Sequence, residues 1–394
     1  ASSVWRDCPP PWSVPGRVYR GFDGLNQELA DFSSWCTNTH EEQSARDQVM
    51  QAVEDIVKKI WPEAFVQVYG SSASELTLPN SDLDLVVRQA GKGRPGGWDG
   101  NIEALSERDL IEALGRALEV SPWVESLEVR SQARVPICAL IHGPTAISLD
   151  ISVDPETPIA EADNDLSDPA SAPPTTAAGG IAAVDLFRRS VSRWSAFRPI
   201  GLVLKCYLGQ QCLNSPFTGG IGSFKLLMLV LVFLDRVGPE EDHLGKTLLH
   251  FLAAFSEEWR FEEVTVGSVT ADYTAVFKGK EIRAAFARAH KALSNAVKSQ
   301  SDSAFFSPLC SILDAARVGE ESRRMPLNSG NKDSSPVPGA PEGGASAAPE
   351  GGASAVGTEA AARQRQVVRV VQTVSCPSTV KAVKAMFGGL NKKR

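Results

Sequence analysis

Two aspartates separated by a single residue are the first feature of the sequence that could do chemistry. Asp82 and Asp84 begin an apolar run with the pattern of a short β-strand, and their spacing places both carboxylates on one face of it. Two carboxylates side by side repel each other unless a cation lies between them. The seven cysteines and five histidines show no metal-ligand spacing, so carboxylates would hold any metal, which favours Mg²⁺ over Zn²⁺.

A Gly-Ser pair lies about a dozen residues before these aspartates. Gly70 and Ser71 follow a predicted strand at 65–69 and open a predicted helix, where backbone N–H groups and a hydroxyl are suited to a phosphate. An Asp-x-Asp alone is frequent on protein surfaces, whereas a strand, a Gly-Ser pair and an Asp-x-Asp in this order form a specific signal. The combination predicts one site for a cation and a phosphate.

The elements that must position these residues are a mixed α/β part followed by helices. Thr39 and Glu42 have the spacing of a capping box at the start of an amphipathic helix. Residues 147–153 alternate strictly between apolar and polar, which predicts a half-buried strand with a polar face. A further strand is predicted at 83–87. The later helical patterns cover 182–195, 200–211, 223–235, 246–255 and 281–297.

Length and composition limit the class of protein. The chain has 394 residues, 43% of them hydrophobic and 22% charged, which is typical of a soluble globular protein with two domains and additional chain. The longest apolar run, Leu226–Leu234, is about half as long as a membrane span. The first residues lack the pattern of a secretory signal. Because the cysteines are scattered, we expect a reduced, intracellular chain without a disulfide framework.

Three stretches have the composition of linkers, at 91–100, 154–180 and 299–359. The last contains the perfect repeat APEGGASA at 340–347 and 348–355, which is too short and too polar to stack as a solenoid. From residue 360 onward the chain has eight basic and no acidic residues. Because the net charge of the whole chain is −7, the part before residue 360 has a net charge of −15. Such a tail contacts nucleic acid or serves as a nuclear address, or it is simply a solvated segment.

The Gly-Ser followed by Asp-x-Asp resembles the signature of the DNA polymerase β-like nucleotidyltransferases. Members of that family add a third aspartate on a neighbouring strand, and the three hold two magnesium ions. Asp150 and Asp154 share the polar face of the strand at 147–153, and both are candidates. Asp150 lies in mid-strand and is preferred, since Asp154 stands at the strand end beside a proline, where a carboxylate is usually a turn residue. The resemblance implies that Asp82, Asp84 and Asp150 hold the metal and form the catalytic centre.

The predicted helical half of the sequence resembles one particular group within these nucleotidyltransferases. Residues 198–205 and 213–224 look like the central domain of the topoisomerase-related, non-templated poly(A) RNA polymerases (the PAP-associated domain family), and the likeness extends over 21–298. Carried over by position, Lys205 would meet the β- and γ-phosphates of the incoming nucleotide, Ser223 would hydrogen-bond the triphosphate, and Phe224 would stack on the base. Gly70 and Ser71 would complete the nucleotide site.

Two departures from the family pattern concern the sugar and the base. The position that often offers a side chain to the ribose is here Gly179-Gly180, which has none to offer. The nucleotide-recognition loop is shortened at 266–274, where only Asp272 matches. Selectivity for base and sugar is therefore less firmly implied than the chemistry.

The resemblance implies a fold of two parts with flanking segments. These are an α/β (α+β) nucleotidyltransferase domain with a small mixed sheet and a mostly helical central domain, followed by a disordered C-terminal tail. The expected boundaries are an N-terminal extension at 1–20, helices belonging partly to the helical domain at 21–60, the catalytic domain at 61–153, an acidic insert at 154–180, the helical domain at 181–299, a low-complexity linker at 300–360 and the basic tail at 361–394.

The implied activity is that of a polynucleotide adenylyltransferase, a poly(A) polymerase that adds AMP from ATP to an RNA 3′ end without a template. The implied role is in nuclear RNA surveillance and decay. Mg²⁺ is the expected cofactor, with Mn²⁺ as a substitute. The expected partners are ATP, RNA, and a zinc-knuckle RNA-binding protein with a helicase, as in TRAMP-like complexes, and no membrane. The expected location is the nucleus, the nucleolus included, with the cytoplasm as the alternative.

Three other functions remain open. A terminal uridylyltransferase on the same scaffold commonly carries a second lysine one turn after Lys205 and a histidine in the recognition loop. Gly209 occupies the first place, and no histidine lies between His250 and His290. A catalytically inactive scaffold would be expected to lack an aspartate, and all three are present. A small-molecule adenylyltransferase would leave the likeness of the helical half unexplained.

Overall fold

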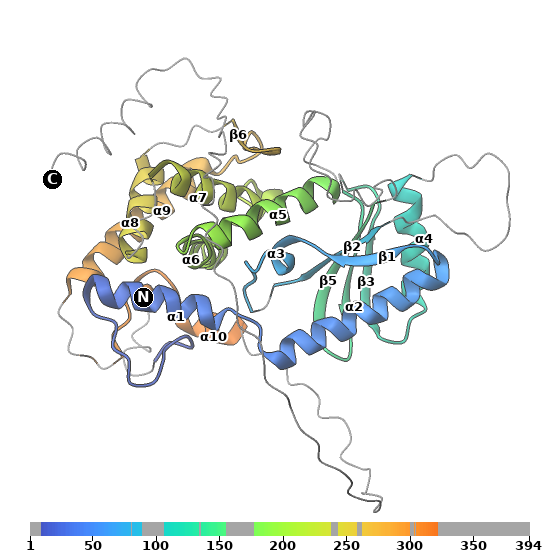
Figure 1. Cartoon of the computed structure of the whole chain (residues 1–394), viewed down its shortest axis with the longest axis horizontal. Coiled ribbons are helices and arrows are strands. Elements are labelled where there is room, and N and C mark those ends of the chain that lie inside the picture. The colour runs from blue at the N-terminus through green and yellow to red at the C-terminus, as the bar shows by residue number, and fades with distance from the viewer. Residues whose placement is uncertain are drawn as a thin grey trace, which may run out of the picture.

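The computed structural model describes residues 9–79, 81–88, 106–133, 135–154, 177–237, 243–257, 262–299, 303 and 305–321. These residues form a five-stranded sheet with its own helices and, beside it, a group of packed helices (Figure 1). The predicted linker at 91–100, most of the acidic insert and the basic tail lie outside the described residues. Within the described ranges, no helix is long and apolar enough to cross a membrane.

The sheet is mixed, as the sequence predicts. Its strand order is β1-β2-β5-β4-β3, with β2 and β5 parallel and all other neighbours antiparallel. The predicted strands at 65–69, 83–87 and 147–153 are confirmed, whereas β3 is largely exposed and carries too little alternation to be predicted. The strands are β1 (Phe65–Val68), β2 (Leu83–Arg88), β3 (Val124–Arg130), β4 (Ile137–His142) and β5 (Ile147–Asp154).

One face of the sheet is covered by α2 (His40–Ile60) and α4 (Glu107–Glu119). The odd-numbered residues of β2 and β5 point into this core, because side chains alternate along a strand. The predicted capping box fixes the start of α2, since Glu42 N–H donates to Thr39 Oγ1 at 3.2 Å and Thr39 N–H donates to Glu42 Oε2 at 2.7 Å. Burial of the odd-numbered side chains turns the even-numbered ones, Asp84 and Asp150 among them, to the other face.

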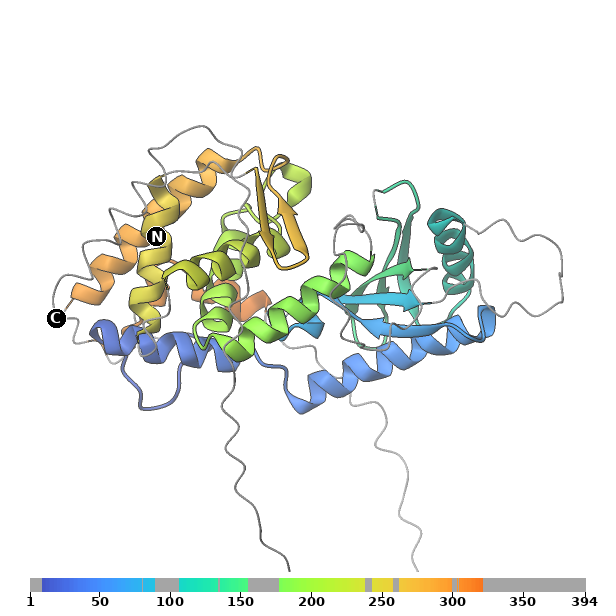
Figure 2. The same cartoon turned by 45° about the horizontal axis from the view of Figure 1, so that its top comes forward.

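The helical group surrounds a second hydrophobic core, in which α6 and α7 are buried on nearly all sides. The five predicted helices in this half are confirmed, and α5 begins five residues earlier than predicted. Figure 2 shows α5 running from the sheet to the helical group. The members are α1 (Gly21–Trp35), α5 (Ala177–Arg193), α6 (Phe197–Gln210), α7 (Ser223–Val237), α8 (Leu244–Glu257), α9 (Gly279–Lys298) and the hairpin β6 (Glu263–Val266) with β7 (Val269–Asp272).

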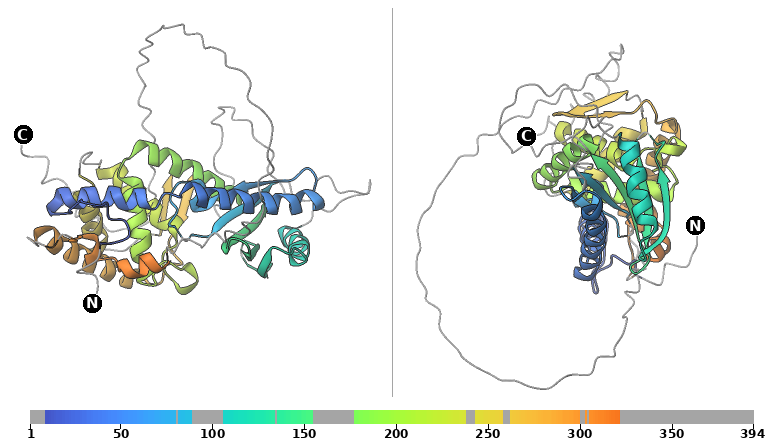
Figure 3. Two further views of the ribbon diagram at one scale, coloured as in Figure 1. Left: turned by 90° about the horizontal axis from the view of Figure 1, so that it is seen from below. Right: turned by 90° about the vertical axis from the view of Figure 1, so that its right-hand side faces the viewer.

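The start of the expected linker after residue 300 is folded, which corrects the sequence prediction. Residues 305–321 contain a 3₁₀ turn at Leu309–Ser311, which contacts α1, and the helix α10 (Ala315–Glu321, orange in Figure 3). Leu309, Leu313 and Val318 are buried in the helical core. The reason is that a few apolar side chains, spaced along polar chain, suffice to dock a short segment on a large existing core.

Glu28 on α1 ties both ends of the described chain to this core. Its carboxylate is completely buried and accepts hydrogen bonds from Trp12 Nε1 at 3.0 Å, from the Leu309 backbone N–H at 2.9 Å, and from Ser307 Oγ. Burial raises the pKa of Glu28 to about 7, against the three donors, which lower it. The buried carboxyl group is therefore held in place by its donors rather than by a cation.

Replacing Glu28 with alanine should lower the free energy of unfolding by about 3 kcal/mol, because three buried donors lose their acceptor. Glu28→Gln keeps the volume and one acceptor oxygen, so it should lose clearly less. Urea unfolding at neutral pH measures both changes. A Glu28→Ala variant with the unfolding midpoint of the wild type would mean that the two ends are not held through this group.

Candidate active site

Asp84 and Asp150 lie side by side on the central pair of parallel strands. Their Cα atoms are register partners in the β2–β5 ladder, so the two side chains project from adjacent positions of the same face. Asp82 lies two residues before Asp84, just outside β2, and is exposed. The strand pairing thus brings a residue from the Asp-x-Asp against one that is more than sixty positions later in the sequence.

The two strand carboxylates are strongly perturbed by their surroundings. Burial, with smaller contributions from Asp150 and Asp82, raises the pKa of Asp84 to about 6, while a hydrogen bond from the Ser71 backbone N–H opposes the rise. Burial, followed by the charge of Asp82, also raises the pKa of Asp150, and Arg130 opposes it. Both groups therefore carry negative charge that the surrounding protein does not neutralise.

This donor set suits a divalent cation with a preference for oxygen ligands. Among the described residues, no three carboxylate, imidazole or thiol groups are already close enough together to hold a metal ion. What the structure offers is the Asp84–Asp150 pair, with Asp82 at the mouth of the same site. The pair fits a divalent cation, because a cation there would stabilise the charged forms of two carboxylates whose pKa values burial, and then nearby carboxylates, raise.

The turn after β1 brings backbone against this pair. Gly70 has a φ of +65°, and a Cβ atom at this position would lie 2.2 Å from Asp84 Oδ2. Both observations require glycine. The following helix, α3 (Gly70–Ala73), is short, and Ser74 Oγ and Thr77 Oγ1 fix its shape by donating to backbone carbonyls within it. The Gly-Ser turn is thereby held directly over the carboxylates, as its position in the sequence predicts.

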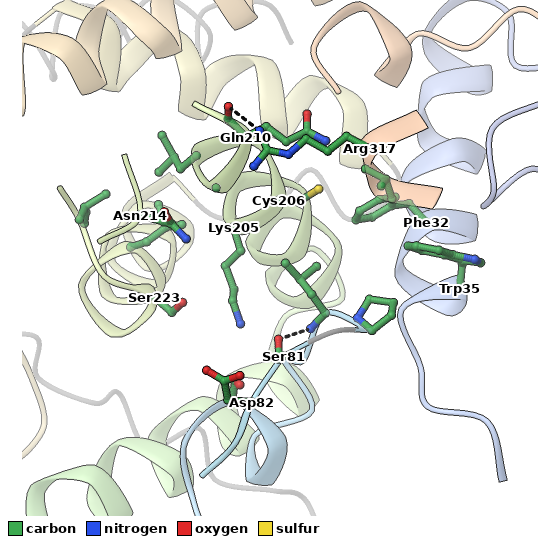
Figure 4. Close-up of a pocket in the computed structure, with 18 of the residues that line it drawn as sticks. Phe32, Trp35, Ser81, Asp82, Lys205, Cys206, Gln210, Asn214, Ser223 and Arg317 are labelled. Atoms are coloured by element: carbon green, nitrogen blue, oxygen red, sulfur yellow. Dashed lines mark hydrogen bonds between the residues drawn. The ribbon is translucent and has the colours of Figure 1, made fainter. Parts of the chain in front are cut away.

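A pocket of about 410 Å³ opens beside these carboxylates, between the sheet and the helical group (Figure 4). Asp82, Asp84 and Ser71 line its sheet side, and Lys205 on α6 lines its helical side. Figure 4 shows the Lys205 side chain pointing toward Asp82. Lys205 Nζ donates to the Leu76 carbonyl at 2.5 Å, and burial lowers the pKa of this ammonium to about 8, with the charge of Asp84 acting against the decrease.

The two other predicted nucleotide-binding residues are placed differently. Ser223 is the first residue of α7 and lines the pocket. Phe224 does not line it: its ring is half-buried, packs on the helical core and lies 6.1 Å from the ring of Phe187, centroid to centroid. The pocket therefore brings Ser223 together with Lys205, Asp82 and Asp84, whereas Asp150 and Gly70 are not among the residues that line it. The stacking of Phe224 on a base stays a prediction.

Asp154, the rejected candidate for the third carboxylate, is not the turn residue that its neighbouring proline indicates. It is the last residue of β5 and is buried beside Arg88 of β2, with Arg88 Nε 3.2 Å from Asp154 Oδ2. Arg88 Nε makes no aligned hydrogen bond, so the pair is a charge contact. Four residues of strand, about 13 Å, separate Asp154 from Asp150.

Three residues that the sequence reasoning missed also shape the site. Arg46 of α2 donates to the Ser81 carbonyl at 2.9 Å and toward Ser72 Oγ at 3.4 Å, so it links the residue just before the Asp-x-Asp to the short helix α3. Gln210 and Arg317 line the far side of the pocket. In the sequence, Arg46 could have been noticed as a charged residue beside the apolar stripe of the helix at 40–60. Arg317 could have been noticed because apolar residues such as Leu309 and Leu313 interrupt the predicted linker just before it.

A mixed sheet with a Gly-Ser turn and two aspartates on its central strand pair, beside a pocket of about 410 Å³ that faces a helical group, is similar in fold to the polymerase β-like nucleotidyltransferases. Residues 25–161 match the family model described as "Poly(A) RNA polymerase, mitochondrial-like, central palm domain". The chain is accordingly similar to the non-templated poly(A) RNA polymerases, the group that its helical half resembles.

Curated relatives show the same likeness. Poly(A) RNA polymerase protein 2 of Saccharomyces cerevisiae is 27% identical over 254 residues, which cover 62% of this chain and 38% of the relative. Poly(A) RNA polymerase cid14 of Schizosaccharomyces pombe is 25% identical, over 65% of this chain and 34% of the relative. Trf4-2 of Drosophila melanogaster, which is named an inactive poly(A) RNA polymerase, is 24% identical over 64% of this chain. The chain thus spans less than half the length of the first two.

Solved structures share the fold. The polymerase core of TRAMP, an RNA surveillance complex, superposes with a TM-score of 0.59 at 24% identity and covers 77% of this chain and 98% of its own. A cytoplasmic RNA terminal U-transferase superposes with a TM-score of 0.51 at 15% identity, over 72% of this chain and 98% of its own. Enzymes of this fold generally use divalent metal ions, which agrees with the carboxylate pair.

Gly70→Ala should destabilise the protein more than Gly21→Ala, although both glycines have a φ of +65°. A Cβ atom on Gly21 meets nothing within 4 Å, so this variant isolates the backbone cost of about 1 kcal/mol. Gly70→Ala adds the collision with Asp84, so it should lower the free energy of unfolding by at least about 1 kcal/mol more than Gly21→Ala does. It should also weaken the binding of Mn²⁺. Urea unfolding and Mn²⁺ titration test this. Equal losses would show that the close approach of Gly70 to Asp84 is not maintained.

Asp84→Asn should stabilise the metal-free protein at pH 7.5 by on the order of 2 kcal/mol and change it little at pH 4. Because the folded pKa of Asp84 is about 6 rather than 3.8, the folded state binds a proton that the unfolded state has released, and wild-type stability falls as pH rises from about 4 to about 6. The asparagine does not titrate. Urea unfolding in a chelator, at both pH values, measures the difference, and a variant less stable than wild type at pH 7.5 would contradict it.

Proposed function

We propose that the protein is a template-independent RNA nucleotidyltransferase that adds AMP from ATP to an RNA 3′ end. The observation that carries this proposal is the register of Asp84 with Asp150, together with a pocket that Asp82 and Asp84 line on one side and Lys205 on the other. A paired carboxylate site for cations and a basic group for phosphates, a short distance apart, are what a nucleoside triphosphate with its metal requires. The likeness to poly(A) RNA polymerases supports the choice of RNA and ATP.

Asp82, Asp84 and Asp150 would hold magnesium, with Mn²⁺ as a substitute. When bound, the metal would lower the pKa of the RNA 3′-hydroxyl and neutralise charge on the triphosphate, so no protein side chain is needed as a base. The 3′-oxygen forms a bond to the α-phosphorus as the bond to the β-phosphate breaks, and pyrophosphate leaves. The Gly70–Ser71 turn would offer the Ser71 hydroxyl to the phosphates, since the Ser71 backbone N–H already donates to Asp84.

On the helical side, Lys205 and Ser223 would bind the triphosphate and Phe224 would stack on the base. Lys205 is well placed for this, because burial and the Leu76 carbonyl fix its ammonium group within the pocket. Phe224 would have to be reached from the edge of the pocket, since its ring already packs against Phe187. The lysine and serine therefore supply the fixed contacts, and base recognition is the looser part of the site.

A preference for ATP over UTP follows from what the recognition region offers. Selection of uracil needs polar groups placed against its carbonyls and imide, and the sequence has no histidine between His250 and His290 to supply one. Asp272 accepts hydrogen bonds from the backbone and side chain of Thr274, so its carboxylate serves a turn. Stacking on an apolar ring favours the larger purine by about 1 kcal/mol, roughly fivefold. We expect preference for ATP with leakage to other nucleotides.

The rival uridylyltransferase function shares this scaffold. The U-transferase is similar in fold, and a mitochondrial poly(A) polymerase of the same fold has been solved with GTP, UTP and ATPγS. Likeness of fold therefore does not select the base. The inactive relative Trf4-2 adds a second rival, against which Asp82, Asp84 and Asp150 are all present in this chain.

The RNA and its delivery are part of the proposal. Outside the basic tail the chain carries −15, which disfavours contact with RNA phosphates. A partner that supplies RNA affinity is therefore expected, a zinc-knuckle RNA-binding protein with a helicase in a TRAMP-like assembly. The protein is similar in fold to the polymerase core of TRAMP, which is described as an RNA surveillance complex, and this motivates the proposed assembly. A nuclear location is part of the same proposal.

Extension of a labelled RNA, with each nucleoside triphosphate supplied separately and Mg²⁺ present, tests the function. Wild type should extend with ATP best, and Asp150→Asn should reduce extension at least about a thousandfold, since one metal ligand is lost. Asp154→Asn is the matched control on the same face of β5. It should keep most of the extension but melt at lower temperature, because Arg88 loses its ion partner.

Two results would contradict the assignment. An Asp150→Asn protein that extends RNA as well as Asp154→Asn would remove Asp150 from the catalytic centre. A clear preference of the wild type for UTP would replace the adenylyltransferase by the uridylyltransferase.

A further inference from the structure

The far wall of the pocket is built by the C-terminal segment. Arg317 and Val318 of α10 line the same pocket as Asp82 and Lys205 (Figure 4). This helix lies in the stretch that has the composition of a linker, and it follows the last residue of the family match by more than 150 positions. A segment outside the matched domain therefore completes the site.

The charges around the pocket are divided between its two sides. Asp82 and Asp84 are the acidic side chains that line it, and Lys205 and Arg317 are the basic ones. The acidic pair lies on the sheet, and both cations come from the helical side. A ligand that matches this division has a cation at one end and a chain of anionic groups extending away from it, as a metal-bound triphosphate does.

Helix α10 is fixed to the end of α6 by a reciprocal set of hydrogen bonds. The Asp314 backbone N–H donates to Gln210 Oε1 at 2.8 Å, and Gln210 Nε2 donates to the Asp314 carbonyl at 3.1 Å. Arg317 Nη1 donates to the Gln210 carbonyl at 3.3 Å. Val318, buried in the core, anchors the helix from its other side. The guanidinium is thus held at the pocket wall before any ligand arrives.

The helix that carries Lys205 offers no second cation to the pocket. One turn later it presents Gly209, which also lines the pocket and has no side chain. A Cβ atom on Gly209 would meet only the Asn214 side chain, at 3.6 Å, which is ordinary contact. The position is therefore open rather than closed by packing, and the second cation of the pocket comes from α10.

We infer that Arg317 binds the terminal phosphates of the incoming nucleoside triphosphate, so that α10 is a working part of the nucleotide site. The inference rests on the proposed function and extends it to a segment outside the matched domain. A guanidinium suits this task, because its planar fork donates two parallel hydrogen bonds to phosphate oxygens. Lys205 then contacts the middle of the phosphate chain, and Arg317 contacts its end.

The test uses the full chain and the variant Arg317→Gln, which keeps a donor and most of the length but removes the charge. The KM for ATP should rise about tenfold to a hundredfold, the range for a lost hydrogen bond to a charged group, with a smaller change in kcat. Arg288→Gln is the matched control: Arg288 also donates to the end of α6, at Gln211, but does not line the pocket. It should leave the KM unchanged.

Two further variants separate charge from structure. Arg317→Lys should lie between wild type and Arg317→Gln, and adding Gly209→Lys to Arg317→Gln should restore part of the ATP affinity from the neighbouring end of α6. Equilibrium binding of ATP, AMP and tripolyphosphate with Mg²⁺ gives a readout without RNA. Arg317→Gln should weaken ATP and tripolyphosphate and leave AMP unchanged.

An unchanged KM and ATP affinity in Arg317→Gln, while the wild type extends RNA, would overturn this inference and leave the proposed function intact. Weaker RNA binding with unchanged ATP affinity would also overturn it and assign Arg317 to the RNA backbone. A wild-type protein that binds ATP through Arg317 but extends no RNA would uphold the inference and contradict the proposed function.

Discussion

The repulsion between Asp84 and Asp150 is the constraint around which this structure is organised. Parallel pairing of β2 with β5 places the two carboxylates at register positions, where burial raises both pKa values and the charge of nearby carboxylates adds to the rise. Such an arrangement costs stability and persists only because other contacts enforce the register. The enforcing contacts are apolar: the odd-numbered residues of both strands are buried against α2 and α4, and a shift by one residue would bury the aspartates instead.

The same constraint explains the composition of the surrounding turns. The segment after β1 approaches Asp84 so closely that only glycine fits at position 70, and the segment before β2 is held by Arg46 from α2. The Arg88–Asp154 pair closes the other end of the strand pair and gives β5 one neutralised aspartate beside an un-neutralised one. Identical residue types on one face of a strand thus serve stability at one end and chemistry at the other.

The helical group supplies what the sheet lacks, namely positive charge near the carboxylates. Lys205 can be buried because its ammonium group donates a hydrogen bond to the Leu76 carbonyl and the charge of Asp84 favours its protonated form. Arg317 reaches the pocket because Glu28, deep in the helical core, fixes the segment that leads to α10. The segment around Trp12 and the segment that leads to α10 are therefore both held by the buried carboxyl group of Glu28.

The sequence alone determined the elements and the chemistry with local signals. Strict alternation identified β5, a capping box identified the start of α2, and the Gly-Ser followed by Asp-x-Asp identified the turn after β1 and predicted a cation site beside it. These features are readable because helix and strand periods and caps depend on neighbouring residues. Tertiary structure decided the rest. Whether Asp150 or Asp154 meets Asp84 depends on strand register, and whether Phe224 faces the pocket depends on packing against Phe187. The place of Arg317 depends on the docking of a segment that is too short and too polar to be predicted as a helix from its sequence. Its few buried side chains stabilise it only by packing on a hydrophobic core that distant parts of the chain form.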